Sequence, residues 1–147
     1  MDGTSQKIIL DILLFMGEEG IRYKTSEIED VLDYVERMLS DERILVIYDD
    51  NKMNTVLFFS VCNDYMNYLR KPTWIYKEHN PYGKMVYIEK IVSKTYNKEI
   101  RLKIQHLIMS LYPTVRFGKW HVFGKIGDRE TTTTPKEISC HNSEFIS

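Results

Sequence analysis

The spacing of apolar residues changes near residue 44, and this change constrains the fold more than any other feature of the chain. Between residues 28 and 39, apolar residues recur in steps of three and four, which is typical of a helix that packs along one face. From Ile44 onward, β-branched and aromatic runs replace this spacing. Helices and strands therefore do not alternate regularly. The order predicts an α+β fold with a mixed, mostly antiparallel sheet flanked by helices.

Two helices are expected in the first 40 residues. The first is short and mostly buried, from Ser5 to Met16, and glycines at positions 17 and 20 bracket its end. The second runs from about residue 27 to residue 39. Ser26 with Glu29 three residues later predicts a capping box at its start. Its expected buried face consists of Ile28, Val31, Leu32, Val35, Met38 and Leu39.

The remaining elements follow in a different order. Residues 44–48 and 55–62 read as a hairpin around a polar turn, and residues 85–92 read as a further strand. A third helix is expected over 97–111, with an apolar face of Ile100, Ile104, Leu107, Ile108 and Leu111. Two short strands, 114–117 and 120–126, complete a single domain over residues 1–127. Residues 128–147 show no period and predict an irregular tail.

Composition excludes several classes of protein. The chain has 147 residues, of which 43% are apolar and 28% charged, as in ordinary globular domains. No apolar run reaches the roughly 18 residues of a membrane span, and the start lacks the basic region of a secretory signal. We therefore expect a soluble, cytoplasmic protein with no membrane contact. The two cysteines and four histidines show no metal-ligand spacing, so no metal is expected.

Charge is unevenly distributed along the chain. Residues 1–50 hold 5 basic and 13 acidic residues, whereas residues 51–147 hold 15 basic and 8 acidic residues. One interpretation is a domain with an acidic face and a basic face that attract each other or another copy. The other is that the basic part meets an anion, such as a phosphorylated cofactor, a nucleic acid or an acidic protein.

The stretch from 63 to 84 is an insertion that interleaves aromatic and basic residues. Such residues anchor protein interfaces, and they also stack on bases and hold phosphates. We predict that this insertion carries a contact with a protein partner or a second copy, or else covers an edge of the sheet; a nucleic acid is a further alternative. The expected contact residues are Tyr65, Arg70, Lys71, Trp74 and Tyr76.

A resemblance to a known family comes from residues 83–125. The strand at 85–92 with Glu89 near its centre, the helix that ends at Tyr112-Pro113, and the following Val115-Arg116-Phe117 resemble the core of the GNAT (Gcn5-related N-acetyltransferase) fold. More narrowly, they are similar to the shortened versions encoded by bacteriophages and to toxin-activating acyltransferases. The order of elements matches over about residues 5–126.

The resemblance implies a function and a set of site residues. It implies a phage- or mobile-element-encoded N-acyltransferase that uses acetyl-CoA or another acyl-CoA, in the host cytoplasm or in the virion. Glu89 would accept a proton from the amine, and Tyr112 would protonate the thiolate. Asn97, Lys98 and Arg101 would bind the cofactor. The simpler alternatives are that Glu89 pairs with a cross-strand lysine and that Tyr112 packs beside Pro113.

The chain departs from the family pattern at the cofactor loop. Glu99 and Arg101 occupy the two positions where the family has small residues that let the backbone approach a pyrophosphate. We therefore predict weak or absent coenzyme A binding. The catalytic histidine of toxin-activating relatives has no counterpart, since the first histidine is His79. A non-catalytic binding or virion-associated protein on the same fold stays open as the second interpretation, and a nucleic-acid-binding accessory protein as the third.

Overall fold

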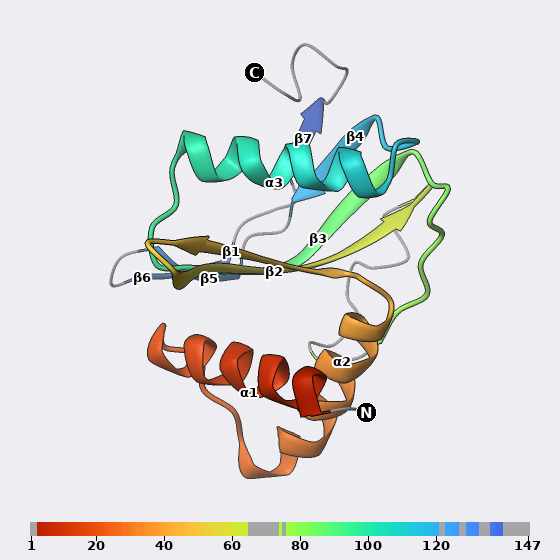
Figure 1. The fold of residues 1–147 in the computed structure, drawn as a ribbon. Helices are drawn as coiled ribbons and strands as arrows, with labels where there is room; N and C mark the ends of the chain where they lie inside the picture. Colours follow the sequence, from red (N-terminus) through yellow and green to blue (C-terminus); the bar gives the residue numbers. More distant parts are fainter. Residues whose placement is uncertain are drawn as a thin grey trace.

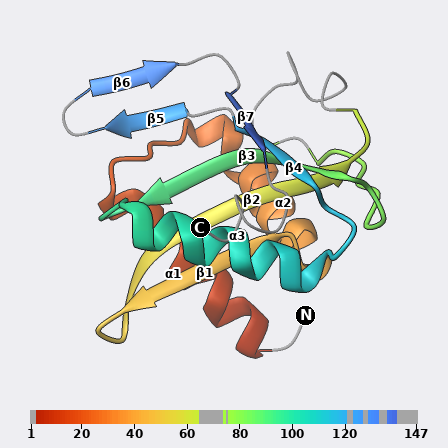
Figure 2. The ribbon, with the colours of Figure 1, turned by 90° about the horizontal axis from the view of Figure 1, so that it is seen from above.

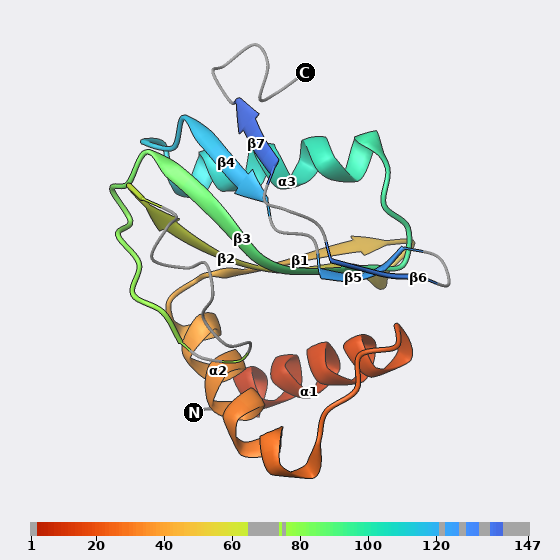
Figure 3. The same cartoon turned by 180° about the vertical axis from the view of Figure 1, so that it is seen from behind.

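The protein has three layers. The computed structural model describes residues 3–64, 74, 76–120, 123–126, 129–132 and 136–139, with only the backbone described from residue 117 on. A five-stranded sheet carries α3 (Lys98–Leu111) on one face and α1 (Gly3–Glu18) with α2 (Ile28–Ser40) on the other (Figures 1 and 3). A short 3₁₀ turn, Thr25–Glu27, leads into α2. The predicted α+β class is confirmed.

The sheet is antiparallel except at one pair of strands. Its order is β1-β2-β3-β4-β7. The strands β1 (Ile44–Asp49), β2 (Lys52–Cys62) and β3 (Met85–Ser93) form an antiparallel meander, and β7 (Lys136–Ser139) pairs antiparallel with β4 (Phe117–Trp120). β4 runs parallel to β3, because α3 crosses over between them. A separate hairpin of β5 (Phe123–Ile126) and β6 (Arg129–Thr132) lies beside the sheet (Figure 2).

Each face of the sheet has its own apolar core. β2 is buried on both faces, because successive side chains of a strand point in opposite directions. Toward α3, its side chains pack with Ile100, Ile104 and Ile108. On the other face, Val56 and Phe58 pack with α1 and α2, whose buried residues are Ile9, Ile12, Phe15, Met16, Val31, Tyr34, Val35 and Met38. None of the described helices combines the length and apolar character that a membrane span requires.

The structure corrects several predicted boundaries. The first helix extends two residues further at each end than predicted. The two strands that follow α3 begin three residues later than predicted, at residues 117 and 123. The side chains of Tyr112 and Val115, between α3 and the first of these strands, are instead buried in the core. The prediction of an irregular tail is wrong at residues 129–132 and 136–139, which form strands. The pairing is made by the backbone, so it does not need an apolar period.

The start of α2 also differs from the prediction. The backbone N–H of Lys24 donates to the carboxylate of Glu27 at 3.0 Å, and the N–H of Glu27 donates to the carbonyl of Lys24 at 2.9 Å. The helical segment therefore begins two residues earlier than predicted, and only the Glu27 half of a capping box is formed there. Ser26 is inside the 3₁₀ turn, so its hydroxyl is not the cap of the helix.

Four residues predicted to be buried are exposed. Ile28 and Leu32 on α2, and Leu107 and Leu111 on α3, all lie at the surface. The spacing placed them near the edge of each apolar face, and the sheet covers only the middle of that face. Tyr34 and Gln105 occupy buried positions in their place.

Candidate functional site

Glu89 lies at an irregularity in the pairing of β2 and β3. Phe58 pairs with Lys90, and Phe59 pairs with Ile88, so Glu89 has no cross-strand partner. This is a β-bulge, in which one extra residue is inserted into one strand. Bulges redirect side chains and are frequent next to functional sites. Glu89 is therefore the residue of β3 whose placement most needs an explanation.

The bulge turns two consecutive side chains to the same face of the sheet. Glu89 accepts a hydrogen bond from Tyr34 of α2, and Lys90 lies over the ring of Trp74 in the core beneath α2. In a regular strand these two residues would face opposite sides. The Lys90 Nζ atom is 4.4 Å from the Trp74 ring centroid, and burial lowers the pKa of this lysine to about 8.

Four side chains donate hydrogen bonds to the Glu89 carboxylate. Lys77 Nζ and the Tyr34 hydroxyl reach Oε1 at 3.0 and 3.3 Å. Arg43 Nη2 reaches Oε2 at 3.2 Å, and the Ser60 hydroxyl donates to the same oxygen. The Glu89 side chain is only 4% exposed. Both oxygens are thus held by donors of the protein, and the carboxylate is closed to a substrate amine.

Arg43 is the centre of this polar network. The side chain is fully buried. Its Nε donates to the carbonyl of Phe59 at 3.1 Å, and Nη1 donates to the carbonyl of Lys77 at 2.8 Å and faces Asp41 at 3.5 Å. Together with the bonds of Nη2 to Ser60 and Glu89, these five hydrogen bonds match the five N–H donors of a guanidinium. No local pattern indicates this role, because Arg43 directly follows two acidic residues between the predicted helix and the first predicted strand.

The network fastens the end of the insertion to the sheet. The Tyr76 hydroxyl donates to Asp41, and the Arg37 guanidinium lies 4.0 Å from the Tyr76 ring centroid. His79 Nδ1 accepts a hydrogen bond from the backbone N–H of Val61 at 3.1 Å. Burial, followed by the charge of Arg43, lowers the pKa of this histidine from its ordinary value of 6.5.

The predicted contact residues of the insertion are only in part described. Trp74 is buried, with the rings of Tyr23, Tyr34 and Phe58 around it at centroid distances of 5.5, 5.6 and 6.4 Å. The Trp74 ring therefore completes the core beneath α2, and the predicted contact with a partner stays a prediction. Tyr76 is also turned inward. The three other predicted contact residues, Tyr65, Arg70 and Lys71, lie outside the described residues.

Tyr112 is held within the core on the other face of the sheet. Its hydroxyl donates to the carbonyl of Glu42 at 3.3 Å, and its ring meets those of Phe59 and His79 at 5.7 and 5.5 Å. Burial raises the pKa of the phenol. Tyr112 packs with α3, whereas Glu89 faces α2, so the structure does not bring these two residues together. The geometry favours the packing alternative.

The loop before α3 uses its polar groups internally. The Asn97 side chain accepts a hydrogen bond from the N–H of Ile100 at 2.9 Å and so caps the helix. The N–H of Thr95 donates to the side chain of Asn54 at 3.3 Å. Of the predicted cofactor ligands, Asn97 is thus engaged as a cap. Lys98 is exposed and Arg101 is partly exposed in the first turn of α3.

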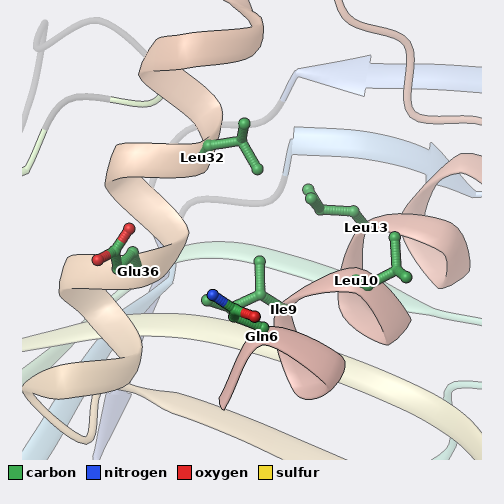
Figure 4. A pocket seen from close by; sticks show the side chains of 6 residues that line it. All are labelled: Gln6, Ile9, Leu10, Leu13, Leu32 and Glu36. Carbon is green, nitrogen blue, oxygen red and sulfur yellow. The ribbon is translucent and has the colours of Figure 1, made fainter. Parts of the chain in front are cut away.

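An open hollow lies between α1 and α2. It has a volume of about 470 Å³, and Figure 4 shows its lining residues on the two helices. Leu10 and Leu32 are exposed to 56% and 41%. The helical spacing predicted that Leu32 is buried, so the sequence did not indicate an exposed apolar surface between these helices. The lining consists of Gln6, Ile9, Leu10, Leu13, Leu32 and Glu36.

Two further observations bear on the chemistry. Among the residues that the structure describes, no group of three or more His, Cys, Asp and Glu side chains is placed to hold a metal ion. Comparison of the chain with protein-family models, with curated proteins and with solved structures finds no match in any of the three.

Proposed function

We propose that this chain is a GNAT-like domain that works as a binding protein rather than as an acyltransferase. The observation that carries the proposal is the closed state of the Glu89 carboxylate. A general base must come within hydrogen-bond reach of the proton that it removes. Glu89 is buried with four donors on two oxygens, so an amine would first have to displace Lys77, Arg43, Ser60 or Tyr34.

The loop before α3 supports the same proposal. In the GNAT family, small residues let the backbone approach the cofactor pyrophosphate. Here Glu99 brings a negative charge to that position, and the Asn97 side chain is engaged as the helix cap. A carboxylate beside a pyrophosphate is repulsive, and it also lies where the helix dipole would otherwise attract an anion.

Acyl transfer is the second candidate, and one observation favours it. β3 and β4 are parallel and are joined through α3, with a bulge at Glu89 in β3. This arrangement supports the resemblance to the GNAT fold, in which the acyl-CoA lies beside the corresponding strands. An active member would use Lys98 and Arg101 as cationic partners of the phosphates.

Calorimetric titration with acetyl-CoA separates the two candidates. We expect no saturable binding by the wild-type protein, because of Glu99 and the engaged loop. A double variant, Glu99→Gly with Arg101→Ala, is the matched control for the effect of the loop side chains alone. Micromolar or tighter binding by the wild type would overturn the proposal. In that case Glu89→Gln should lower turnover by roughly 10²–10⁴, and an unchanged rate would remove Glu89 from the mechanism.

A further inference from the structure

We propose that copies of this chain associate head to tail, with the outer face of α3 of one copy seated in the hollow between α1 and α2 of the next. The inference rests on the proposed binding role and names a second copy as the partner. It adds a second surface to the predicted contact at the insertion, where the described residues Trp74 and Tyr76 pack against the core beneath α2.

The receiving surface has a mostly apolar lining with one acidic residue, Glu36, and lies against an acidic helix. Leu10 and Leu32 are exposed at the hollow, and Glu36 lines it. The exposed apolar side chains of α1 and α2 are half of the large ones found at the surface of the described residues; they are Ile8, Leu10, Leu14, Ile28 and Leu32. Helix α2 carries four acidic residues and a single arginine, Arg37, which lies 3.9 Å from Asp33. Such a surface favours an apolar ligand with positive charges at its margin.

The outer face of α3 has the complementary character. Lys103, Leu107 and Leu111 are spaced four residues apart and so form one stripe along the helix. All three are exposed, and Leu107 and Leu111 are 39% and 47% accessible. The helix carries three basic residues against one acidic residue, Glu99. It is thus an amphipathic, cationic helix of the kind that docks in a groove between two other helices.

The sizes and positions of the two surfaces also agree. α3 has 14 residues and α1 has 16, which correspond to lengths of about 21 and 24 Å. The two surfaces lie on opposite faces of the sheet, so one copy can use both at once (Figure 1). A contact between two different surfaces gives open chains or closed rings rather than a simple dimer.

Charge adds direction to this contact. Residues 1–50 have an excess of eight negative charges, and residues 51–147 an excess of seven positive charges. α1 and α2 belong to the first part, and α3 belongs to the second. Attraction between exposed charges is screened over about 10 Å at 0.1 M salt, so the association should weaken as salt rises.

Sedimentation velocity on two surface variants tests the contact. Leu32→Asp disables the hollow, and Leu107→Asp disables the helix face. We expect each variant alone to associate at least about tenfold more weakly than the wild type, since each places a charge where a leucine is buried. An equimolar mixture should form a 1:1 dimer and stop there, because one intact hollow meets one intact helix. Tyr82→Asp, at an exposed turn that belongs neither to α3 nor to the lining of the hollow, should associate as the wild type does.

Each other outcome overturns the inference. A wild type that stays monomeric at all concentrations removes the second copy as partner, while acetyl-CoA titration still tests the binding role separately. Dimers of Leu107→Asp alone would mean that two hollows face each other. If an aspartate variant fails to fold by circular dichroism, Glu36→Lys and Lys103→Glu replace it. Each should weaken self-association alone, and mixing the two should restore it; no loss in either overturns the contact.

Discussion

The surroundings of Glu89 and the hollow between α1 and α2 differ in how completely their groups are satisfied. Around Glu89, five N–H donors of Arg43 and both carboxylate oxygens have partners within the chain. At the hollow, the leucines at positions 10 and 32 are exposed to water. A polar cluster in a buried position is costly unless it is closed, whereas an exposed apolar surface gains free energy when something covers it. The comparison indicates a structural role for the network around Glu89, and it supports the proposed contact at the hollow.

The closed network also explains how the insertion is fixed. Replacing a buried ion pair by apolar residues of the same size is often neutral for stability, but breaking it by removing one partner is costly. Here the partners come from four separated segments: Arg43 before β1, Ser60 in β2, Lys77 within the insertion and Glu89 in β3. The network therefore defines how these segments meet.

The largest effect is expected for Arg43→Met. The substitution leaves Glu89 without its guanidinium and leaves the carbonyls of Phe59 and Lys77 without a donor. The free energy of unfolding should fall by about 3–5 kcal/mol. Arg116→Met is the matched control, because this arginine is exposed and outside the network, and it should change stability by no more than about 0.5 kcal/mol. Urea denaturation measures both, and a loss below about 1 kcal/mol for Arg43→Met would break the comparison.

A smaller effect is expected where the insertion returns to the sheet. A Cβ atom added at Gly83 would lie 2.5 Å from the carbonyl oxygen of Cys62, so the backbone would have to move. Gly83→Ala should lower the free energy of unfolding by about 1–3 kcal/mol. At Gly17 in α1, a Cβ atom meets nothing within 4 Å, and Gly17→Ala should stabilise the protein by about 0.5–1 kcal/mol. Equal effects at the two positions would contradict the close packing of the insertion on β2.

Much of the fold follows from patterns in the sequence, and the exceptions have physical causes. The steps of three and four residues predicted the bounds of α2 and α3 to within about one residue. The β-branched runs predicted the strands β1, β2 and β3. Periodicity reports burial along one element, so it identified Ile104 and Ile108. It did not reveal where a neighbouring element ends, which is why Leu32 and Leu107 were expected to be buried.

The polar network was harder to predict. Glu89 stood out as an acid inside an apolar strand, and its pairing with a lysine was one of the alternatives. The lysine, Lys77, comes from the insertion rather than from a neighbouring strand, so strand pairing alone does not indicate it. Tyr34 follows Val31 by three residues, so the helical spacing alone could have placed it on the buried face of α2. Arg43 depends on contacts between distant segments, and no local feature marks it.

The smallest effect concerns pH and His79. The pKa of this histidine is lowered in the folded protein by burial and by Arg43, against the opposing charges of Asp41 and Glu89. The unfolded chain therefore binds the proton more readily. Its contribution to stability is present above about pH 6.5 and is lost as the pH falls through that value toward the lower folded pKa. Unfolding free energies between about pH 5 and 8 should show a shallower fall for His79→Gln than for the wild type. A pH slope in His79→Gln equal to that of the wild type would contradict the assignment.

The central claim is tested most directly by comparing the unfolding free energies of Glu89→Gln and Leu32→Asp. If Glu89 holds the fold together, its amide variant should lose about 3–5 kcal/mol, because Arg43 and Lys77 then lack their anion. Leu32→Asp should stay within about 0.5 kcal/mol of the wild type, because that side chain is exposed. The contradicting result is a Glu89→Gln variant as stable as the wild type or more stable. That outcome would remove the structural role assigned to Glu89, and acetyl-CoA titration would then decide between the two candidate functions.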